Sequence, residues 1–313
     1  MTKLTKELRA KLRKLRGGGA RFDKSAACFT SERASDGSWR KLHGLTKTLA
    51  SLVPVPRVFA GAGASRRTLN GPAARYAPAD AASECANFSG RTMARCGTCR
   101  AAVRAAREQR PELAREGAAK VHGIVVDEQL TAYIGGGRRA LFAHGVVDPC
   151  VGTLLEFFDR RGWALVASQV PLMSASMNVA TACDLLATDR ATRRALHLIE
   201  IKTAFAQDDT LHNYEERRGY LTRSDLRGMP LSFYARHQTQ LCCMRHAALE
   251  SSGVEFDSAL LVRVSPGVVR AYELHDWWRR RSARIANAVA ALRNPSSAAF
   301  RARQRRRKAR PRA

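Results

Sequence analysis

Two apolar segments in the middle of the chain are separated by a short polar stretch. The first covers residues 181–188 and the second residues 194–205, with the polar residues 189–192 between them. Short apolar runs on either side of a few polar residues are typical of a β-hairpin. The pattern therefore predicts two antiparallel strands joined by a turn near Thr192.

Alternation along the second strand separates its charged side chains from its apolar ones. Glu200 and Lys202 share one face and two isoleucines share the other, because successive side chains of a strand point to opposite sides. A turn centred near Thr192 would place Asp184 opposite Glu200. The hairpin thus predicts two acids and one lysine on one face of apolar strands.

Three charges within apolar strands need a shared explanation, because a buried charge is costly unless it is paired or bound to a metal. A buried ion-pair network is one explanation, and strands at a solvated edge of the sheet are another. The third is a metal site, in which Asp184 and Glu200 hold Mg²⁺ or Mn²⁺ through oxygen. Lys202 would then orient water or stabilise charge in the transition state. We favour the metal site.

Helical and strand patterns alternate along the rest of the chain. Helical spacing of apolar residues is present at 3–16, 39–52, 118–133, 151–160 and 232–250, and 101–110 is also expected to be helical. Residues 163–170 predict a strand that ends at Pro171, and 259–264 and 268–274 predict a second hairpin. The glycines at 135–137 should break the helix that begins at Ala118. Residues 54–89 predict a long loop or partly disordered insertion.

The order of the charged residues resembles that of the PD-(D/E)xK nuclease superfamily. Asp184 and Glu200 match its metal-binding acids, Lys202 matches its lysine, and Glu156 in Leu154-Leu155-Glu156-Phe157-Phe158 matches its first-helix acid. The resemblance covers residues 116–275. It implies that Glu156, Asp184 and Glu200 hold Mg²⁺ or Mn²⁺ and that Lys202 assists the attacking water.

A later helix carries a second part of the resemblance. It is similar to the Gln/Tyr helix of the RecB and lambda-exonuclease branch, which implies that Gln238 assists catalysis and that Tyr234 contacts nucleic acid; the matching residues are Tyr234-Ala235-Arg236-His237-Gln238-Thr239-Gln240-Leu241. The chain also resembles the basic nuclear nuclease-like proteins of herpesviruses. The residues of that likeness are Glu200-Ile201-Lys202-Thr203, Gln240-Leu241 and Leu260-Leu261-Val262-Arg263-Val264.

These resemblances imply an α/β fold of the restriction-endonuclease-like type. A mixed central sheet would be flanked by helices, with a helical and irregular N-terminal extension and basic tails. The chain departs from the family pattern at Ala182-Cys183, where Pro or Gly commonly precedes the Asp, and at Gln169, where some relatives have Glu. The second departure would weaken metal binding in a branch that needs the extra acid.

Charge is concentrated at the two ends of the chain. The formal net charge is +27, of which residues 1–17 carry +6 and residues 279–313 carry +13. A body of near-ordinary charge with two basic ends is typical of a protein that binds nucleic acid. DNA, contacted through its phosphate backbone, is the predicted partner.

We divide the chain into four parts on these grounds. They are a basic amphipathic arm (1–19), a helical and loop-rich region (20–115), a nuclease-like core (116–278) and an Arg-rich tail (279–313). The arm could lie on a membrane, dock on a partner or follow phosphates, and we favour the last. The tail should bind DNA and the nuclear import machinery through Arg305, Arg306, Arg307 and Lys308. This predicts a nuclear or nucleolar protein, in a host cell if the chain is viral.

Eight cysteines are present, and the chain starts without a secretory signal. No run approaches the roughly 20 apolar residues of a membrane span, so we expect no membrane partner and reduced, intracellular thiols. Cys96 and Cys99 have the spacing of metal ligands, but a zinc site needs two more. Cys85 and His122 are conceivable partners, although structural or free thiols are the preferred interpretation.

Three functional hypotheses follow. The first is a Mg²⁺-dependent deoxyribonuclease that acts in viral or nuclear DNA processing or recombination. The second is a DNA-binding, regulatory or packaging protein on an inactive nuclease scaffold. The third, a basic structural protein, explains the ends of the chain but not the charges of the core. We favour the first.

Overall fold

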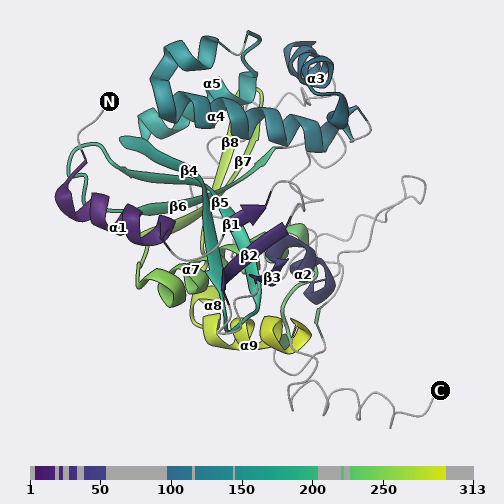
Figure 1. The fold of residues 1–313 in the computed structure, drawn as a ribbon, viewed down its shortest axis with the longest axis vertical. Coiled ribbons are helices and arrows are strands. Elements are labelled where there is room, and N and C mark those ends of the chain that lie inside the picture. Colours follow the sequence, from purple (N-terminus) through teal and green to yellow (C-terminus); the bar gives the residue numbers. More distant parts are fainter. Residues whose placement is uncertain are drawn as a thin grey trace, which may run out of the picture.

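A mixed β-sheet lies between two layers of helices (Figure 1). The computed structural model describes residues 4–17, 21–23, 28–33, 39–53, 97–114, 117–143, 145–203, 220–221 and 226–293. The predicted α/β class is confirmed. Within these stretches, no helix combines the length and the apolar character needed to cross a membrane.

The central sheet consists of five strands in the order β4-β5-β6-β7-β8. Their bounds are β4 (Trp163–Ser174), β5 (Val179–Asp189), β6 (His197–Thr203), β7 (Ser258–Ser265) and β8 (Val268–Glu273). β6 and β7 pair in parallel, and the other neighbours pair antiparallel. A short parallel contact joins the start of β5 to β3 (Trp39–Gly44), which β2 (Cys28–Arg33) and β1 (Arg21–Asp23) extend.

Both predicted hairpins are present. In the first, Leu185 pairs with Ile199 and Ala187 with His197, which is the register of a turn centred near Thr192. The second consists of β7 and β8. The alternation of side chains was sufficient to set the register, because a shift by one residue would move every apolar side chain to the wrong face.

The first long strand is longer than the sequence predicted. β4 continues through Pro171, which pairs with Ala182 of β5, and ends at Ser174. β4 pairs only with β5 among the described strands, so its other side has no ladder for proline to interrupt. An edge strand tolerates proline for this reason.

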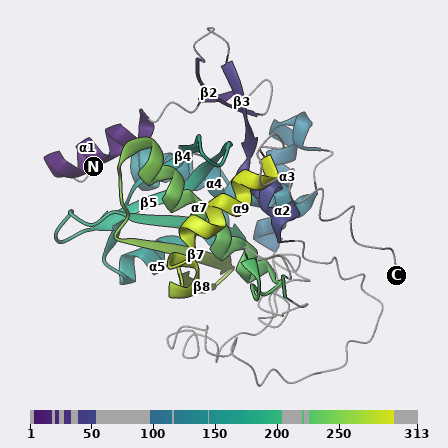
Figure 2. The same cartoon turned by 90° about the horizontal axis from the view of Figure 1, so that it is seen from below.

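Helices α4 (Ala118–Phe142) and α5 (Pro149–Arg160) cover one face of the sheet. α3 (Gly97–Gln109) packs on α4, and a 3-10 turn (Pro111–Leu113) joins them. α7 (Phe233–Ser252) covers the other face, and Figure 2 shows α9 (Ser282–Arg293) lying across it. The short α8 (Asp276–Arg279) precedes α9.

The glycines at 135–137 break the helix at Gly137, as the sequence predicted. α4 continues to Phe142, and only Gly137 departs from helical geometry, with φ 67° and ψ −157°. Glycine reaches a positive φ without steric cost, so one residue takes up the kink and the helix resumes. The predicted break is therefore confirmed at Gly137, and a further helical stretch follows it as far as Phe142.

The N-terminal helix belongs to the core and is not a separate arm. Leu8, Leu12 and Leu15 of α1 (Lys6–Arg16) are buried in the same cluster as α7. Thr5 caps the helix and donates its hydroxyl to the carbonyl of Arg193. The apolar face is thus used within the chain, and only the basic face remains for phosphates.

Two other boundaries also move. The segment 39–52 forms β3 followed by α2 (Leu45–Leu52), where a single helix was predicted, and Leu45, Leu49 and Leu52 join the core. The predicted tail begins too early, because α9 buries Ile285 and Val289. The loop predicted at 54–89 and the residues after Arg293 lie outside the described residues.

Candidate active site

Charged and amide side chains from four elements meet where β5 and β6 separate. The ladder between these strands ends at Leu185 and Ile199. One step further, the backbone N–H of Ile201 donates to Oδ2 of Asp184 at 2.7 Å. The side chain of Asp184 thus accepts the hydrogen bond that a backbone carbonyl of β5 would otherwise accept. This contact places Asp184 beside β6, as the predicted hairpin register required.

Burial and repulsion both disfavour ionisation of Asp184. Its pKa lies well above the ordinary value, first because burial penalises the carboxylate and then because Glu200 and Asp127 are negative. Lys202 and the N–H of Ile201 act in the opposite direction but do not compensate. A group that both acids could bind together, such as a divalent cation, would relieve this repulsion.

Glu200 forms the floor of the site and is only 2% exposed. Its Oε1 accepts hydrogen bonds from Nζ of Lys202 and from Nε2 of Gln240, the latter at 2.6 Å. Its Oε2 is buried without a hydrogen-bond partner among the described residues. An unpartnered buried carboxylate oxygen is costly, and it is the kind of atom that a metal ion would satisfy.

Lys202 carries its proton in this arrangement. Burial alone would lower the pKa of the ammonium, but the charges of Glu200 and Asp184 outweigh that effect and raise it. The side chain is 27% exposed, so it reaches the surface above Glu200. A protonated, half-buried lysine can donate to water or to a phosphate oxygen, but it cannot act as a base.

Asp127 of α4 is the acid that the sequence analysis missed. Its pKa is raised to about 7 by burial and then by the negative charge of Glu200, while Lys202 lowers it. One turn earlier on the same helix, a Cβ on Gly123 would lie 3.8 Å from Oγ1 of Thr203, so this face of α4 lies against the end of β6. The only feature of the sequence that could have indicated Asp127 is its position directly after the apolar residues Val125 and Val126.

Glu156, by contrast, is an exposed residue of α5. The helix turns its neighbours Phe157 and Phe158 into the core. Among the described residues, no hydrogen bond or ion pair links Glu156 to Asp184, Glu200 or Lys202. The structure thus gives no support for the predicted role of Glu156 at the metal, whereas the charge of Asp127, on α4, acts on Glu200 and Asp184.

The glutamine of the site is Gln240 and not Gln238. The amide of Gln238 is buried and donates to the carbonyl of Glu273, while its oxygen accepts from the N–H of His275. Gln238 thus joins α7 to the segment after β8. The predicted catalytic role of Gln238 is corrected for that reason.

Tyr234 is also a core residue. Its ring makes edge-to-face contacts with Tyr272 and Trp278 at centroid distances of 5.3 and 5.8 Å, and the side chain is buried. A ring in this position is not available to stack on a base, which corrects the predicted contact with nucleic acid. The predicted DNA-binding residues Arg305, Arg306, Arg307 and Lys308 lie outside the described residues.

Positive charge borders the acids on the side of β7 and α7. Arg263 is the register partner of Lys202 on β7. The pKa of His237, on α7, is held well below its ordinary value by burial and then by the charges of Lys202, Arg236 and Arg263. His237 is therefore a neutral ring near a group of cations, and it lies one turn before Gln240 on the same helix.

The donors present suit an oxygen-preferring divalent cation, since Asp127, Asp184 and Glu200 are hard ligands. They do not yet converge as closely as ligands of one ion. Among the described residues, one set of His, Cys, Asp and Glu ligand atoms lies mutually within 4.8 Å, and it lies elsewhere, at Cys99, His122, Asp148 and Cys150. Binding of one ion by the three acids therefore requires a side-chain adjustment.

No protein-family model and no curated protein matches the chain. One solved structure that it matches is described as "Putative exonuclease" from Eubacterium rectale. That match has a TM-score of 0.32 and 9% identity and covers 61% of this chain and 74% of the other. Similarity at this level carries no argument about activity, so the functional case rests on the residues of the site.

Proposed function

We propose that this protein is a metal-dependent nuclease that hydrolyses phosphodiester bonds of DNA. The observation that carries the proposal is that Asp127, Asp184, Lys202 and Gln240 all interact with the buried Glu200. Oε2 of Glu200 has no hydrogen-bond partner among the described residues. Two mutually repelling acids beside a protonated lysine have no evident use in a structural protein. They suit a substrate that is an anion and a cofactor that is a cation.

The three acids would hold Mg²⁺ or Mn²⁺, which supplies a Lewis acid that activates water and stabilises the charge on the phosphate. Gln240 fixes the rotamer of Glu200 through Oε1, leaving Oε2 as the free ligand atom. Lys202 donates from the open side and can hold the attacking water or a non-bridging phosphate oxygen in line.

DNA is the favoured substrate because of the cations beside the acids, the basic face of α1 and the charge of the chain ends. Arg263 and Lys202 border the acids, and the exposed face of α1 is basic. Positive charge of this kind attracts the phosphate backbone without reading sequence. With an Arg-rich C-terminal sequence, the chain fits a role in nuclear DNA processing, of viral origin or otherwise.

The alternative is a DNA-binding protein on an inactive nuclease scaffold. It is favoured by the pairing of Glu200 with Lys202 and Gln240, which satisfies Oε1 without metal, and by the separation of the acids. In this alternative the same surface binds DNA and holds it intact.

Incubation of circular and linear DNA with Mg²⁺ or Mn²⁺ separates the two. The nuclease predicts metal-dependent cleavage that Glu200→Ala and Lys202→Ala both abolish, with DNA binding retained by each variant. Cleavage of circles would identify an endonuclease. Tight binding with every substrate left intact would reject the nuclease in favour of the inactive scaffold.

A further inference from the structure

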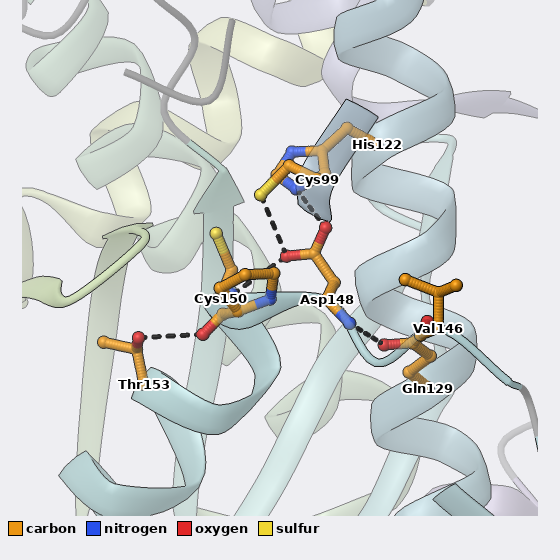
Figure 3. Close-up of polar contacts among 8 residues, drawn as sticks. Cys99, His122, Gln129, Val146, Asp148, Cys150 and Thr153 are labelled. Atoms are coloured by element: carbon orange, nitrogen blue, oxygen red, sulfur yellow. Dashed lines mark hydrogen bonds and ion pairs between the residues drawn. The ribbon is translucent and has the colours of Figure 1, made fainter. Parts of the chain in front are cut away.

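Four potential metal ligands meet at the starts of three helices, away from the candidate active site. Cys99 lies in the first turn of α3, His122 in the early part of α4, Asp148 at the N-cap of α5 and Cys150 in its first turn. Figure 3 shows them converging from these elements. All four side chains are fully buried. From the sequence, Cys99 was considered as a zinc ligand together with Cys96, and Cys85 and His122 were conceivable further ligands. Of these four residues, Cys85 and Cys96 lie outside the described residues.

The spacing of the ligand atoms fits a tetrahedral ion. The four atoms lie within 4.8 Å of one another. Nε2 of His122 is 3.0 Å from Oδ2 of Asp148, and Sγ of Cys99 is 3.6 Å from Oδ1 of the same carboxylate. Zinc–ligand bonds of about 2.0–2.3 Å at tetrahedral angles place neighbouring ligand atoms about 3.3–3.8 Å apart.

The ligand types select zinc over the ion of the active site. Two thiols and an imidazole favour borderline-soft ions, whereas Mg²⁺ takes oxygen. Four protein ligands would complete a tetrahedron and leave no open position, which is typical of structural zinc sites.

Residues around the cluster hold it in place. Oδ1 of Asp148 accepts the backbone N–H of Cys150 at 2.9 Å, and the N–H of Asp148 donates to Oε1 of Gln129 on α4 at 2.9 Å. Gln129 also donates to the carbonyl of Val146 at 2.8 Å. Supporting hydrogen bonds of this type orient the ligands of metal sites.

The packing of α3 gives such an ion a structural purpose. α3 contacts α4 through a small cluster of alanine and valine side chains, among them Ala102, Val103 and Val125. Side chains of this size bury little apolar area and therefore stabilise the contact weakly. A bond from Cys99 to an ion shared with α4 and α5 would fasten α3, and it would also fix α4 five residues before Asp127.

We propose that Cys99, His122, Asp148 and Cys150 form a structural Zn²⁺ site that joins α3, α4 and α5. Zinc replaces the protons of the two thiols and of the Nε2 atom that faces Asp148, and these protons pass to water. The site is independent of the proposed nuclease activity.

The test is the zinc content of the full-length protein, purified without an affinity metal and dialysed against a weak chelator. Elemental analysis should find about one zinc per chain. Cys99→Ser and Cys150→Ser should each lose it. Cys242→Ser should keep it, because Cys242 is a buried cysteine of α7 that bonds to the carbonyl of Trp278. Glu200→Gln should also keep it, which separates this ion from one at the active site.

Cobalt substitution tests the same site without any mutation. Wild-type protein loaded with Co²⁺ should show thiolate-to-metal charge transfer and the strong visible bands of a tetrahedral ion. Folded wild-type protein that carries no zinc and binds Co²⁺ without thiolate absorption would overturn the proposal. Retention of zinc at wild-type stoichiometry by both cysteine variants would overturn it as well.

Discussion

Gln240 reaches across from α7 and donates its side-chain amide to Oε1 of Glu200, on β6, at 2.6 Å. The bond joins the helical layer to the sheet and occupies Oε1, while Oε2 has no hydrogen-bond partner among the described residues. Gln238, two residues earlier, makes its bonds to the backbone of Glu273 and His275 instead. The two glutamines therefore have separable roles.

Replacement of each glutamine by leucine should show this difference. Gln240→Leu should lower metal-dependent cleavage about 10- to 100-fold with DNA binding unchanged, because Glu200 loses a positioning donor. Gln238→Leu should lower the melting temperature, since it leaves a buried carbonyl and N–H unpaired, while activity per folded molecule stays near wild type. The reverse pattern would show that the site is built around Gln238.

The sequence could not distinguish these glutamines, because α7 is buried on most sides. Gln238, Thr239, Gln240 and Leu241 are all buried, so no apolar stripe marks the face that meets β6. The hairpin was predictable because Asp184 and Glu200 follow a period of two and the turn fixed their register.

The sequence also pointed to Glu156, rather than Asp127, as the acid that a helix contributes to the site, for a similar reason. Asp127 and Glu156 each follow apolar residues in a predicted helix, and only the packing of α4 against the end of β6 decides between them. The apolar faces of α4 and α5 could be predicted from the local periodicity of the sequence. Which helix lies beside β6 is a tertiary fact that periodicity does not contain.

Metal binding and stability should depend on pH in opposite ways. The pKa of Asp127 is raised from 3.8 to about 7 in the folded chain. An acid with a raised folded pKa stabilises the fold fully below its unfolded pKa and loses that contribution as pH rises through the folded value. The metal-free melting temperature should therefore fall between about pH 4 and 7, and Mg²⁺ should restore it above pH 7 but not at pH 5.

Differential scanning calorimetry with EDTA or Mg²⁺ measures both effects. Asp127→Asn removes one titrating group and should make the metal-free profile less steep between these limits, while Asp184, whose pKa is also raised, keeps part of the slope. If Mg²⁺ leaves the melting temperature of the wild type unchanged at every pH, the acids do not bind a shared ion.

The N-terminal helix should contribute to stability as a core element. Leu12→Ala should cost about 2–4 kcal/mol of unfolding free energy, as expected for a buried leucine. Lys14→Ala, on the exposed face of the same helix, should cost less than about 0.5 kcal/mol. Urea unfolding compares the two, and equal, negligible effects would mean that α1 is a free arm after all.

Two truncations should separate the C-terminal helix from the basic sequence after it. Removal of residues 294–313 deletes eight basic residues and no acid, so it should weaken DNA binding, reduce its salt dependence and reduce nuclear accumulation without changing the melting temperature. Removal from residue 279 also deletes α9 and should destabilise the fold, because Ile285 and Val289 are buried. Equal melting temperatures for the two truncations would contradict this boundary.

The most direct measurement is cleavage of DNA with Mg²⁺ by the wild type, Asp127→Asn and Glu156→Gln, with DNA affinity measured in parallel. Each substitution removes one carboxylate charge and keeps the size of the side chain. The site described here predicts cleavage by the wild type and by Glu156→Gln, and a loss of at least about 100-fold in Asp127→Asn at unchanged affinity. Loss in Glu156→Gln with Asp127→Asn still active would contradict the site, and intact DNA in every lane would contradict the nuclease.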